Sequence, residues 1–136
     1  MARLEGRVKK GWGEEVIFAT NDMYCGKLLK MKPGKEMSMH FHIKKHETWY
    51  VLGGEFVVQK INTDNATKTA RTVQAGAVIV NTPGEPHKLI CATEGTILEV
   101  STPDSVEDNF RVGKGDSQKN TVIDEVPGSQ PYKGNN

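Results

Sequence analysis

Short runs in which hydrophobic and polar residues alternate occupy most of the chain. Apolar residues do not recur at three-to-four spacing for more than about one turn, so the pattern predicts strands and almost no helix. The runs are rich in β-branched and aromatic residues, which favour strands. We expect strands at residues 14–20, 24–31, 36–42, 48–61, 69–74, 77–81, 87–92 and 96–101.

Turn-forming residues separate these runs. Gly, Pro, Asn and Asp gather in "ND", "KPGK", "NTDNATK", "AGA" and "TPGEP", and the signals "GG" and "TEG" at residues 53–54 and 93–95 mark two more expected turns. Short strands at this close spacing predict an all-β fold, either an antiparallel sandwich or a small barrel. A double-sheet jelly roll is a natural way to close such a sheet.

Length and composition indicate one folded domain. With 136 residues and 36% hydrophobic content, the chain can bury one core but is short for two. From Val112 the composition shifts to Gly, Ser, Lys and Asn, so we predict a domain over residues 1–111 and a C-terminal tail over residues 112–136. Either this tail is extended and partly disordered, or its segment "TVIDEV" pairs with a sheet edge and protects it.

The charge balance argues against several classes of partner. Eighteen Lys and Arg residues oppose seventeen Asp and Glu residues, and a net charge of +1 gives no reason to expect binding to nucleic acid or to an anionic membrane. The first residues resemble no signal peptide, and no run is long enough to span a bilayer. We therefore expect a cytoplasmic protein whose cysteines, Cys25 and Cys91, are reduced.

Three of the four histidines lie in the segment "HFHIKKHE", together with a glutamate. On a strand, alternate side chains share a face, so His40 and His42 point the same way with Cα atoms roughly 6 to 7 Å apart. Glu47 follows across a bend and can add a carboxylate oxygen. His46 stands in the lysine-rich bend itself, where we expect a solvated side chain. The spacing therefore predicts three ligands for a divalent metal ion.

A fourth ligand must come from elsewhere, and His87 is the only histidine outside the cluster. It follows "TPGEP", where two prolines stiffen a turn just before the expected strand "HKLIC". In a sandwich, the start of that strand can lie opposite the histidine pair. We predict a metal site formed by His40, His42, Glu47 and His87.

Two sequence motifs resemble those of the cupin superfamily. The segment "GKEMSMHFHIKKHETWYVLGG" is similar to the first cupin motif, with His40, His42 and Glu47 at the ligand positions. The segment "GAVIVNTPGEPH" is similar to the second motif, with His87 as the fourth ligand. The resemblance covers about residues 7–111. It implies a double-stranded β-helix, the jelly-roll barrel of cupins.

Four segments resemble single-domain mannose-6-phosphate isomerases and the cupin region that ends the bifunctional type II enzymes. They are "KKGWGEE", "KLLKMKPGKEMSMHFH", "ETWYVLGGE" and "ILEVSTPDSVEDNFR". The chain departs from these enzymes after Arg111, where "VGKGDS" stands in place of their usual "DDYGR". The resemblance implies a sugar or sugar-phosphate aldose–ketose isomerase with one divalent ion, which is Zn, Mn, Fe or Ni. It also implies a homodimer that pairs through sheet edges.

Three further residues are candidates for catalysis, because isomerisation needs a base near the migrating proton while a metal ion stabilises the enediolate. Lys27 shares a face with Leu29 and Met31, so its ammonium either leaves the sheet at an edge or meets an anionic group in the cavity. Glu99 transfers protons if its side of the strand faces inward, and is a surface residue otherwise. Arg111 either clamps a phosphate bidentately or closes the domain at its surface.

Two other functions suit the same four ligands. Three histidines and one glutamate also fit iron-dependent dioxygenases of the superfamily. The second alternative is a sugar-binding cupin without turnover, which is favoured if the candidate bases point outward. Oxygen uptake with tightly bound Fe(II) would identify the dioxygenase, and ligand-induced thermal shifts without product would identify the binding protein.

Overall fold

The computed structural model describes residues 6–105, 107–115 and 121–125, and these residues form an all-β structure. Among them, no helix has the length and hydrophobicity needed to cross a membrane. The strands are β1 (Gly6–Lys10), β2 (Gly13–Thr20), β3 (Cys25–Met31), β4 (Met39–Phe41), β5 (Glu47–Asn62), β6 (Thr67–Val73), β7 (Val78–Asn81), β8 (His87–Ser101), β9 (Phe110–Gly113) and β10 (Thr121–Glu125).

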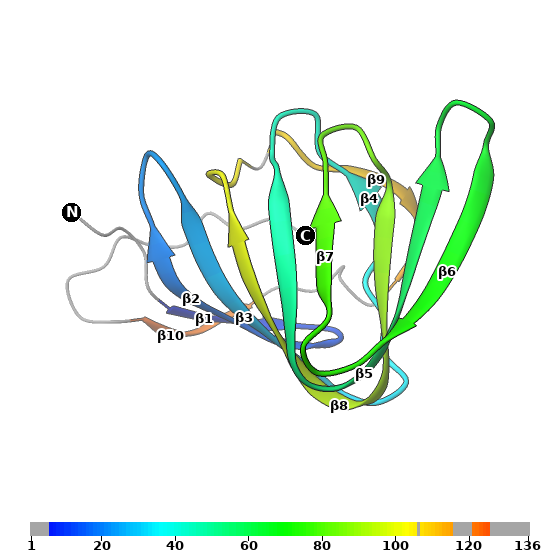
Figure 1. Ribbon diagram of the computed structural model, residues 1–136. Helices are drawn as coiled ribbons and strands as arrows, with labels where there is room; N and C mark the ends of the chain where they lie inside the picture. Colours follow the sequence, from blue (N-terminus) through cyan, green and yellow to red (C-terminus); the bar gives the residue numbers. More distant parts are fainter. Residues whose placement is uncertain (1–5, 106, 116–120, 126–136) are drawn as a thin grey trace.

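The strands pair in a sheet that curls round onto itself (Figure 1). Along one path the order is β10-β1-β2-β3-β8-β4-β9, and β5 joins it by pairing with β8 as well as with β6 and β7. The pairings are antiparallel, and the two longest strands, β5 and β8, run beside each other. The prediction of an all-β jelly roll is confirmed.

Alternation along the strands decides which side chains enter the interior. In β3, Lys27, Leu29 and Met31 are buried, whereas Lys30 on the other face is exposed. The same period of two places the alternate residues of β5 and β8 inside and outside the fold. The inward residues of neighbouring strands therefore line one shared interior.

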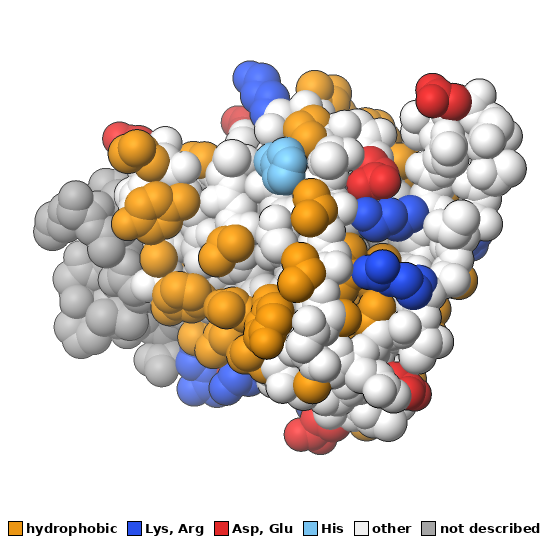
Figure 2. Space-filling model, viewed as in Figure 1, with side chains coloured by type: hydrophobic (Ala, Val, Ile, Leu, Met, Phe, Trp, Pro, Cys, Tyr) orange, Lys and Arg blue, Asp and Glu red, His pale blue; other side chains and the backbone are white. Residues whose placement is uncertain are grey.

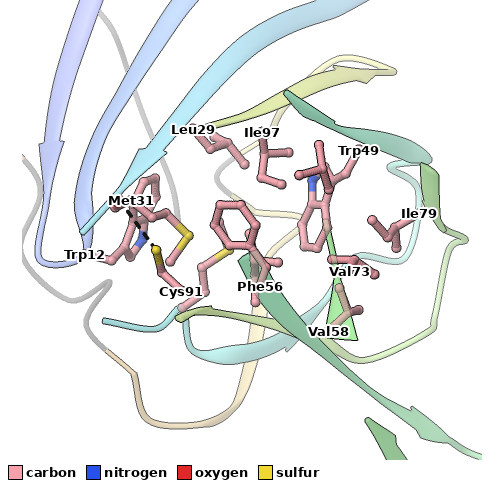
Figure 3. Packing of buried hydrophobic residues seen from close by; sticks show 13 residues of the cluster. Trp12, Leu29, Met31, Trp49, Phe56, Val58, Val73, Ile79, Cys91 and Ile97 are labelled. Atoms are coloured by element: carbon pink, nitrogen blue, oxygen red, sulfur yellow. Dashed lines mark hydrogen bonds between the residues drawn. The ribbon is translucent and has the colours of Figure 1, made fainter. Parts of the chain in front are cut away.

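One cluster of buried hydrophobic residues fills part of that interior (Figure 3). It takes residues from β3, β5, β6, β7 and β8, together with Trp12 from the turn after β1 and Met37 from the segment before β4. Phe56 and Trp49 are essentially inaccessible to solvent. Burying aromatic rings of this size removes a large apolar area from water, so this cluster supplies most of the hydrophobic stabilisation.

Two of the expected turns lie inside long strands. Gly53 and Gly54 continue β5, and Gly95 continues β8, where the pairing of the two strands shifts register between Val51 and Phe56. A Cβ atom on Gly54 would lie 2.5 Å from the Cα atom of Gly95, so only glycine allows the two backbones to approach this closely. The prediction of turns at these glycines is wrong because they mark irregular strand pairing.

The sequence pattern misses two short strands: β1, which is second along the described path, and β9, which ends it. β1 pairs with β2 and, on its other side, with β10. β10 comes from the "TVIDEV" segment, so the structure agrees with the alternative in which this segment covers a sheet edge. Residues 116–120 and 126–136 of the predicted tail lie outside the described residues.

Candidate metal centre

Four side chains from the ends of three strands converge inside the fold. His40 belongs to β4, His42 follows that strand directly, and Glu47 and His87 begin β5 and β8. One ligand atom from each lies within 4.8 Å of those from the others, and all four side chains are buried. The structure thus brings together the four residues that the sequence predicts as ligands.

Strand pairing and one turn place the histidines opposite each other. His40 is the ladder partner of His87 where β4 meets β8. The turn before β8 is tied to β4, because the N–H of Gly84 donates to the carbonyl oxygen of His42 at 2.6 Å. Gly84 has a φ of 80°, a conformation that favours glycine. The "TPGEP" turn therefore directs His87 towards the histidine pair.

The Nδ1 atom of each histidine contacts a backbone carbonyl oxygen. The distances are 2.8 Å from His40 to Ser38, 2.6 Å from His42 to Asp108, and 2.9 Å from His87 to Glu85. A carbonyl oxygen only accepts, so each Nδ1 carries the hydrogen and each Nε2 presents a lone pair to the centre of the cluster. This hydrogen bonding orients the rings as metal ligands before any ion binds.

Two of these Nε2 atoms lack a hydrogen-bond partner. Among the residues that the structure describes, the Nε2 atoms of His42 and His87 are buried and receive no hydrogen bond. Nε2 of His87 also lies 2.8 Å from a carboxylate oxygen of Glu47, so two electron-pair donors face each other. Burial lowers the pKa of His40 and His42, which keeps the rings neutral as ligation requires. Three imidazoles and one carboxylate in this arrangement fit one divalent metal ion.

Charged side chains adjoin the four ligands. The ammonium group of Lys45 lies 3.3 Å from a carboxylate oxygen of Glu47, 3.1 Å from Glu99 and 2.5 Å from Asp104. Burial opposes the charge on Lys45, but Glu99 and Asp104 overcome that effect and hold its pKa well above the ordinary value. Lys45 therefore stays protonated between the candidate ligand Glu47 and a second buried carboxyl group.

Lys27 extends this arrangement from β3. Its fully buried ammonium lies 2.5 Å from Asp104 and 3.4 Å from Glu15. The ion pairs join two ammonium groups to four carboxyl groups, and we call this set the charged network: Glu15, Lys27, Lys45, Glu47, Glu99 and Asp104. The buried Lys10 also interacts electrostatically with Glu15 and Asp104. At the ligand end of the network, the carboxylate of Glu47 favours a divalent cation.

Glu99 is held by three neighbours. The indole N–H of Trp49 donates to its carboxyl group at 3.2 Å, the hydroxyl of Ser101 donates at 3.1 Å, and Lys45 forms the ion pair. Burial raises the pKa of Glu99; Lys45 opposes this shift, and the like charge of Glu47 adds to it. Glu99 therefore accepts a proton more readily than a carboxyl group in water, as a proton-transfer residue must.

Asp108 links the loop after β8 to the loop between β4 and β5. Its carboxylate accepts hydrogen bonds from the backbone N–H groups of Ile43, Lys44 and Lys45 at distances from 2.6 to 3.2 Å. Its backbone carbonyl accepts the 2.6 Å hydrogen bond from His42. One residue thus fixes both a ligand ring and the turn that directs Lys45 inward.

The candidate catalytic residues occupy different places. Lys27 and Glu99 are buried in the charged network. Arg111 lies outside it, exposed on β9 in the ladder position opposite His40, and its role in phosphate binding stays a prediction. His46 is exposed, as the sequence analysis expects.

Sequence reasoning missed Lys45, Asp104, Asp108 and Glu15. Lys45 stands in a run of lysines that reads as a solvated bend, and Asp104 and Asp108 stand in an irregular segment. The alternation in "GEEVIFAT" did carry a signal for Glu15, because Glu15 shares its face with Ile17. The other three have partners that are distant in sequence and become visible only in the folded chain.

Fold and site together define a jelly-roll protein with a candidate metal centre in its interior. The family model described as "Cupin domain" matches residues 27–101, which include all four candidate ligands and more than half of the chain. The chain therefore belongs to the cupin family. No curated protein matches the sequence significantly.

Solved structures show the same fold at low sequence identity. KdgF from Halomonas sp. is 17% identical with a TM-score of 0.60, over 69% of this chain and 81% of that one. Oxalate decarboxylase from Bacillus subtilis is 20% identical with a TM-score of 0.63, over 82% of this chain but only 30% of the decarboxylase. CapF is 16% identical with a TM-score of 0.64, over 76% of this chain and 33% of CapF.

Proposed function

We propose that the protein is a metal-dependent aldose–ketose isomerase that acts on a sugar or a sugar phosphate. The observation that carries this proposal is the position of Glu99. It is a buried carboxyl group with a raised pKa, and a single ammonium group separates it from the metal ligand Glu47. Proton transfer next to a carbonyl group needs such a base beside a site that polarises the carbonyl.

Different residues have different roles in the proposed reaction. His40, His42, Glu47 and His87 would hold the divalent ion, which when bound supplies a Lewis acid for the carbonyl and hydroxyl oxygens of the substrate. Glu99 removes the proton from one carbon and returns it to the neighbouring carbon.

Lys45 and Lys27 balance the charge that develops in the substrate. The ammonium of Lys45 contacts both Glu47 and Glu99, so it lies between the ligand cluster and the base. Lys27 lies further from the base than Lys45 does, and the two ammonium groups are linked by Asp104, which forms an ion pair with each. We further propose that Arg111, exposed on β9, contacts the phosphate of a phosphorylated substrate.

The metal is proposed as Zn, Mn, Fe or Ni, which imidazole and carboxylate ligands accept. The oxalate decarboxylase of Bacillus subtilis has Mn(II) centres, which shows that one protein of this fold uses such an ion. A cytoplasmic location stays a prediction from the sequence.

The experiment loads purified protein with each metal in turn and adds mannose-6-phosphate or fructose-6-phosphate in D₂O without oxygen. Product analysis by NMR is expected to show interconversion with deuterium at the carbon that exchanges its proton. The variant Glu99→Gln is expected to keep the bound metal and to lose roughly 10²- to 10⁴-fold in kcat. Glu94→Gln, an exposed glutamate on the same strand, is the matched control and should behave as wild type.

Metal analysis of His42→Ala gives an independent check, because removing one of four ligands is expected to abolish binding. Full metal occupancy in that variant would refute the assignment of the site. Interconversion absent with every metal, or oxygen uptake with Fe(II), would refute the isomerase and favour the dioxygenase. Thermal shifts on sugar binding without product would identify a binding protein.

A further inference from the structure

The carboxylate of Asp104 bridges two buried ammonium groups. One of its oxygens lies 2.5 Å from Nζ of Lys27, and the other lies 2.5 Å from Nζ of Lys45. Both lysine side chains are at most 1% exposed, and Lys10, a third buried lysine, interacts electrostatically with Asp104. Burying an ammonium group is costly unless an anion accompanies it, so this position in the interior favours a negatively charged oxygen group.

Asp104 differs from the other members of the charged network in its exposure and in its backbone. Its side chain is 17% exposed, whereas the side chains of the other five members are at most 4% exposed. Asp104 follows Pro103 in the irregular segment after β8, and its backbone lies in none of the strands that the structure describes. A change of its side-chain rotamer would therefore release the two ammonium groups without breaking the pairing of these strands.

The two lysines that contact Asp104 have fixed positions. Lys27 lies within β3 and has a ladder partner on each side, one on β2 and one on β8. The backbone N–H of Lys45 donates to the carboxylate of Asp108 at 2.9 Å, which fixes the loop that carries Lys45. Because the backbone holds both lysines independently of Asp104, the ammonium groups would stay in place for another anion if Asp104 moved away.

These buried ammonium groups also lie beside the candidate metal centre. The ammonium of Lys45 is 3.3 Å from a carboxylate oxygen of Glu47, one of the four candidate ligands. By contrast, Figure 2 shows a face of the surface on which the charged side chains are scattered among hydrophobic and uncharged ones. An anionic group held between Lys27 and Lys45 would thus keep the rest of its molecule close to the candidate ligands.

We propose that Lys27 and Lys45 form an oxyanion subsite, which Asp104 fills until the carboxylate or phosphate group of a ligand takes its place. Such a group has the oxygens needed to repeat the contacts of Asp104, with one oxygen on each ammonium group. The inference rests on the proposed function in one respect, that a small molecule binds at the metal centre, and it does not require isomerisation. It narrows the ligand to an acidic molecule, such as a sugar acid or a sugar phosphate, and excludes a neutral sugar.

The experiment titrates the full chain with sodium acetate or sodium phosphate at constant pH, with NaCl holding the ionic strength constant and EDTA preventing binding through a metal ion. The dependence of thermal unfolding on anion concentration gives the affinity. Asp104→Ala removes the competing carboxylate and is expected to bind the preferred anion roughly 10- to 100-fold more tightly than the wild type. Preference for acetate would identify a carboxylate as the natural group, and preference for phosphate would identify a phosphate.

Further variants test whether the two ammonium groups bind the anion. Adding Lys27→Met to Asp104→Ala should abolish the tighter binding, because it removes one of the two ammonium groups. Adding Lys30→Met instead, at an exposed lysine on the same strand, should leave the tighter binding unchanged. Asp22→Ala alters an exposed aspartate before β3 and should bind anions like the wild type. Asp104→Asn, which keeps the size of the side chain but not its charge, should lie between the wild type and Asp104→Ala.

Tighter binding in Asp104→Ala that Lys27→Met removes would support the subsite even if no sugar is isomerised, so this proposal and the isomerase fail separately. Folded Asp104 variants that bind both anions no more tightly than the wild type would overturn the subsite, and Asp104 would then only neutralise the buried lysines. An Asp104→Ala variant that is unfolded and does not refold in acetate or phosphate would overturn it too, because an anion in the subsite would restore the lost ion pairs.

Discussion

The interior of this cupin has an apolar part and a charged part that share the inward faces of β3 and β8. On β3, Lys27 precedes Leu29 by one inward position, and on β8, Glu99 follows Ile97 in the same way. All of these side chains are almost completely buried. Only the chemistry of the side chains distinguishes the two parts, and not their depth or their backbone.

The difference shows what each part contributes. Apolar side chains stabilise the fold simply by leaving water. Buried charges lose hydration that their mutual attraction rarely exceeds, so replacing such groups with hydrophobic residues is often neutral or stabilising. Stability therefore gives no reason for six charged groups in one ion-paired set next to three histidines, which is why we place binding and chemistry there in the proposed function.

The largest effect on stability is expected in the apolar part. Phe56→Ala should lower the free energy of unfolding by about 3 to 5 kcal/mol, because it removes a ring from the centre of the core and leaves a cavity. Chemical denaturation monitored by fluorescence measures the change. Phe110→Ala, which truncates an exposed ring on β9, is the control and should cost far less. Equal losses would mean that the apolar cluster is not the source of stability.

In the charged part, the effect of a substitution should depend on which partners remain. Lys45→Met is expected to cost about 3 kcal/mol in the metal-free protein, because Glu99 loses its ion pair and Asp104 keeps only the one with Lys27. Adding Glu99→Gln to Lys45→Met should recover part of that loss. A double-mutant cycle, measured by denaturant unfolding, gives the coupling free energy between Lys45 and Glu99. If the losses in unfolding free energy were strictly additive, the two residues would not stabilise each other by pairing.

The pH dependence of stability measures the cost of burying the charge of Lys10. Burial lowers its pKa from 10.5 to about 8, although Glu15 opposes the shift. The protonated form is therefore disfavoured in the folded state. Stability should rise as pH increases from 8 to 10.5, where the unfolded chain still binds the proton.

Lys10→Met is accordingly expected to be more stable than wild type below pH 8, by at most about 3 kcal/mol. The gap should shrink as the pH approaches 10.5. Unfolding of both proteins at a series of pH values gives the difference, and a gap that does not change with pH would rule out the titration of Lys10 as its cause.

The smallest effect is expected at Asp108, which acts on the ligands only through the backbone. Asp108→Ala removes the carboxylate that caps three N–H groups of the β4–β5 loop, and should weaken metal affinity about 10- to 100-fold. Asp108→Asn keeps an acceptor oxygen and should lose less. Metal competition titrations measure both variants. Glu107→Ala, which changes an exposed neighbour, should leave the metal affinity unchanged. A loss of the same size in Glu107→Ala would mean that any change in this loop weakens the affinity, and that the carboxylate of Asp108 has no specific role.

Patterns among neighbouring residues were sufficient to predict much of the fold and of the candidate metal site. The two-residue spacing of His40 and His42, the acid at Glu47 and the proline-bounded turn before His87 are short-range features, so the four candidate ligands that the structure brings together could be predicted from the sequence. The all-β fold followed from short alternating runs and their turns, and the resemblance to cupins implied the jelly roll. The glycines at Gly54 and Gly95 led to a wrong prediction of turns, because glycine is equally favourable in a turn and where two backbones approach closely.

Other features depended on contacts between distant parts of the chain. Alternation shows that Glu99 and Leu98 lie on opposite faces of β8, but only the packing of the curled sheet shows that Glu99 is inside. The burial of Lys45 depends on Asp108, far along the chain, which holds the loop that turns it inward. The sequence by itself determined the strand period and the ligand spacing, because both are set by neighbouring residues. The tertiary structure decided which charges share the interior, because that depends on how the sheet closes.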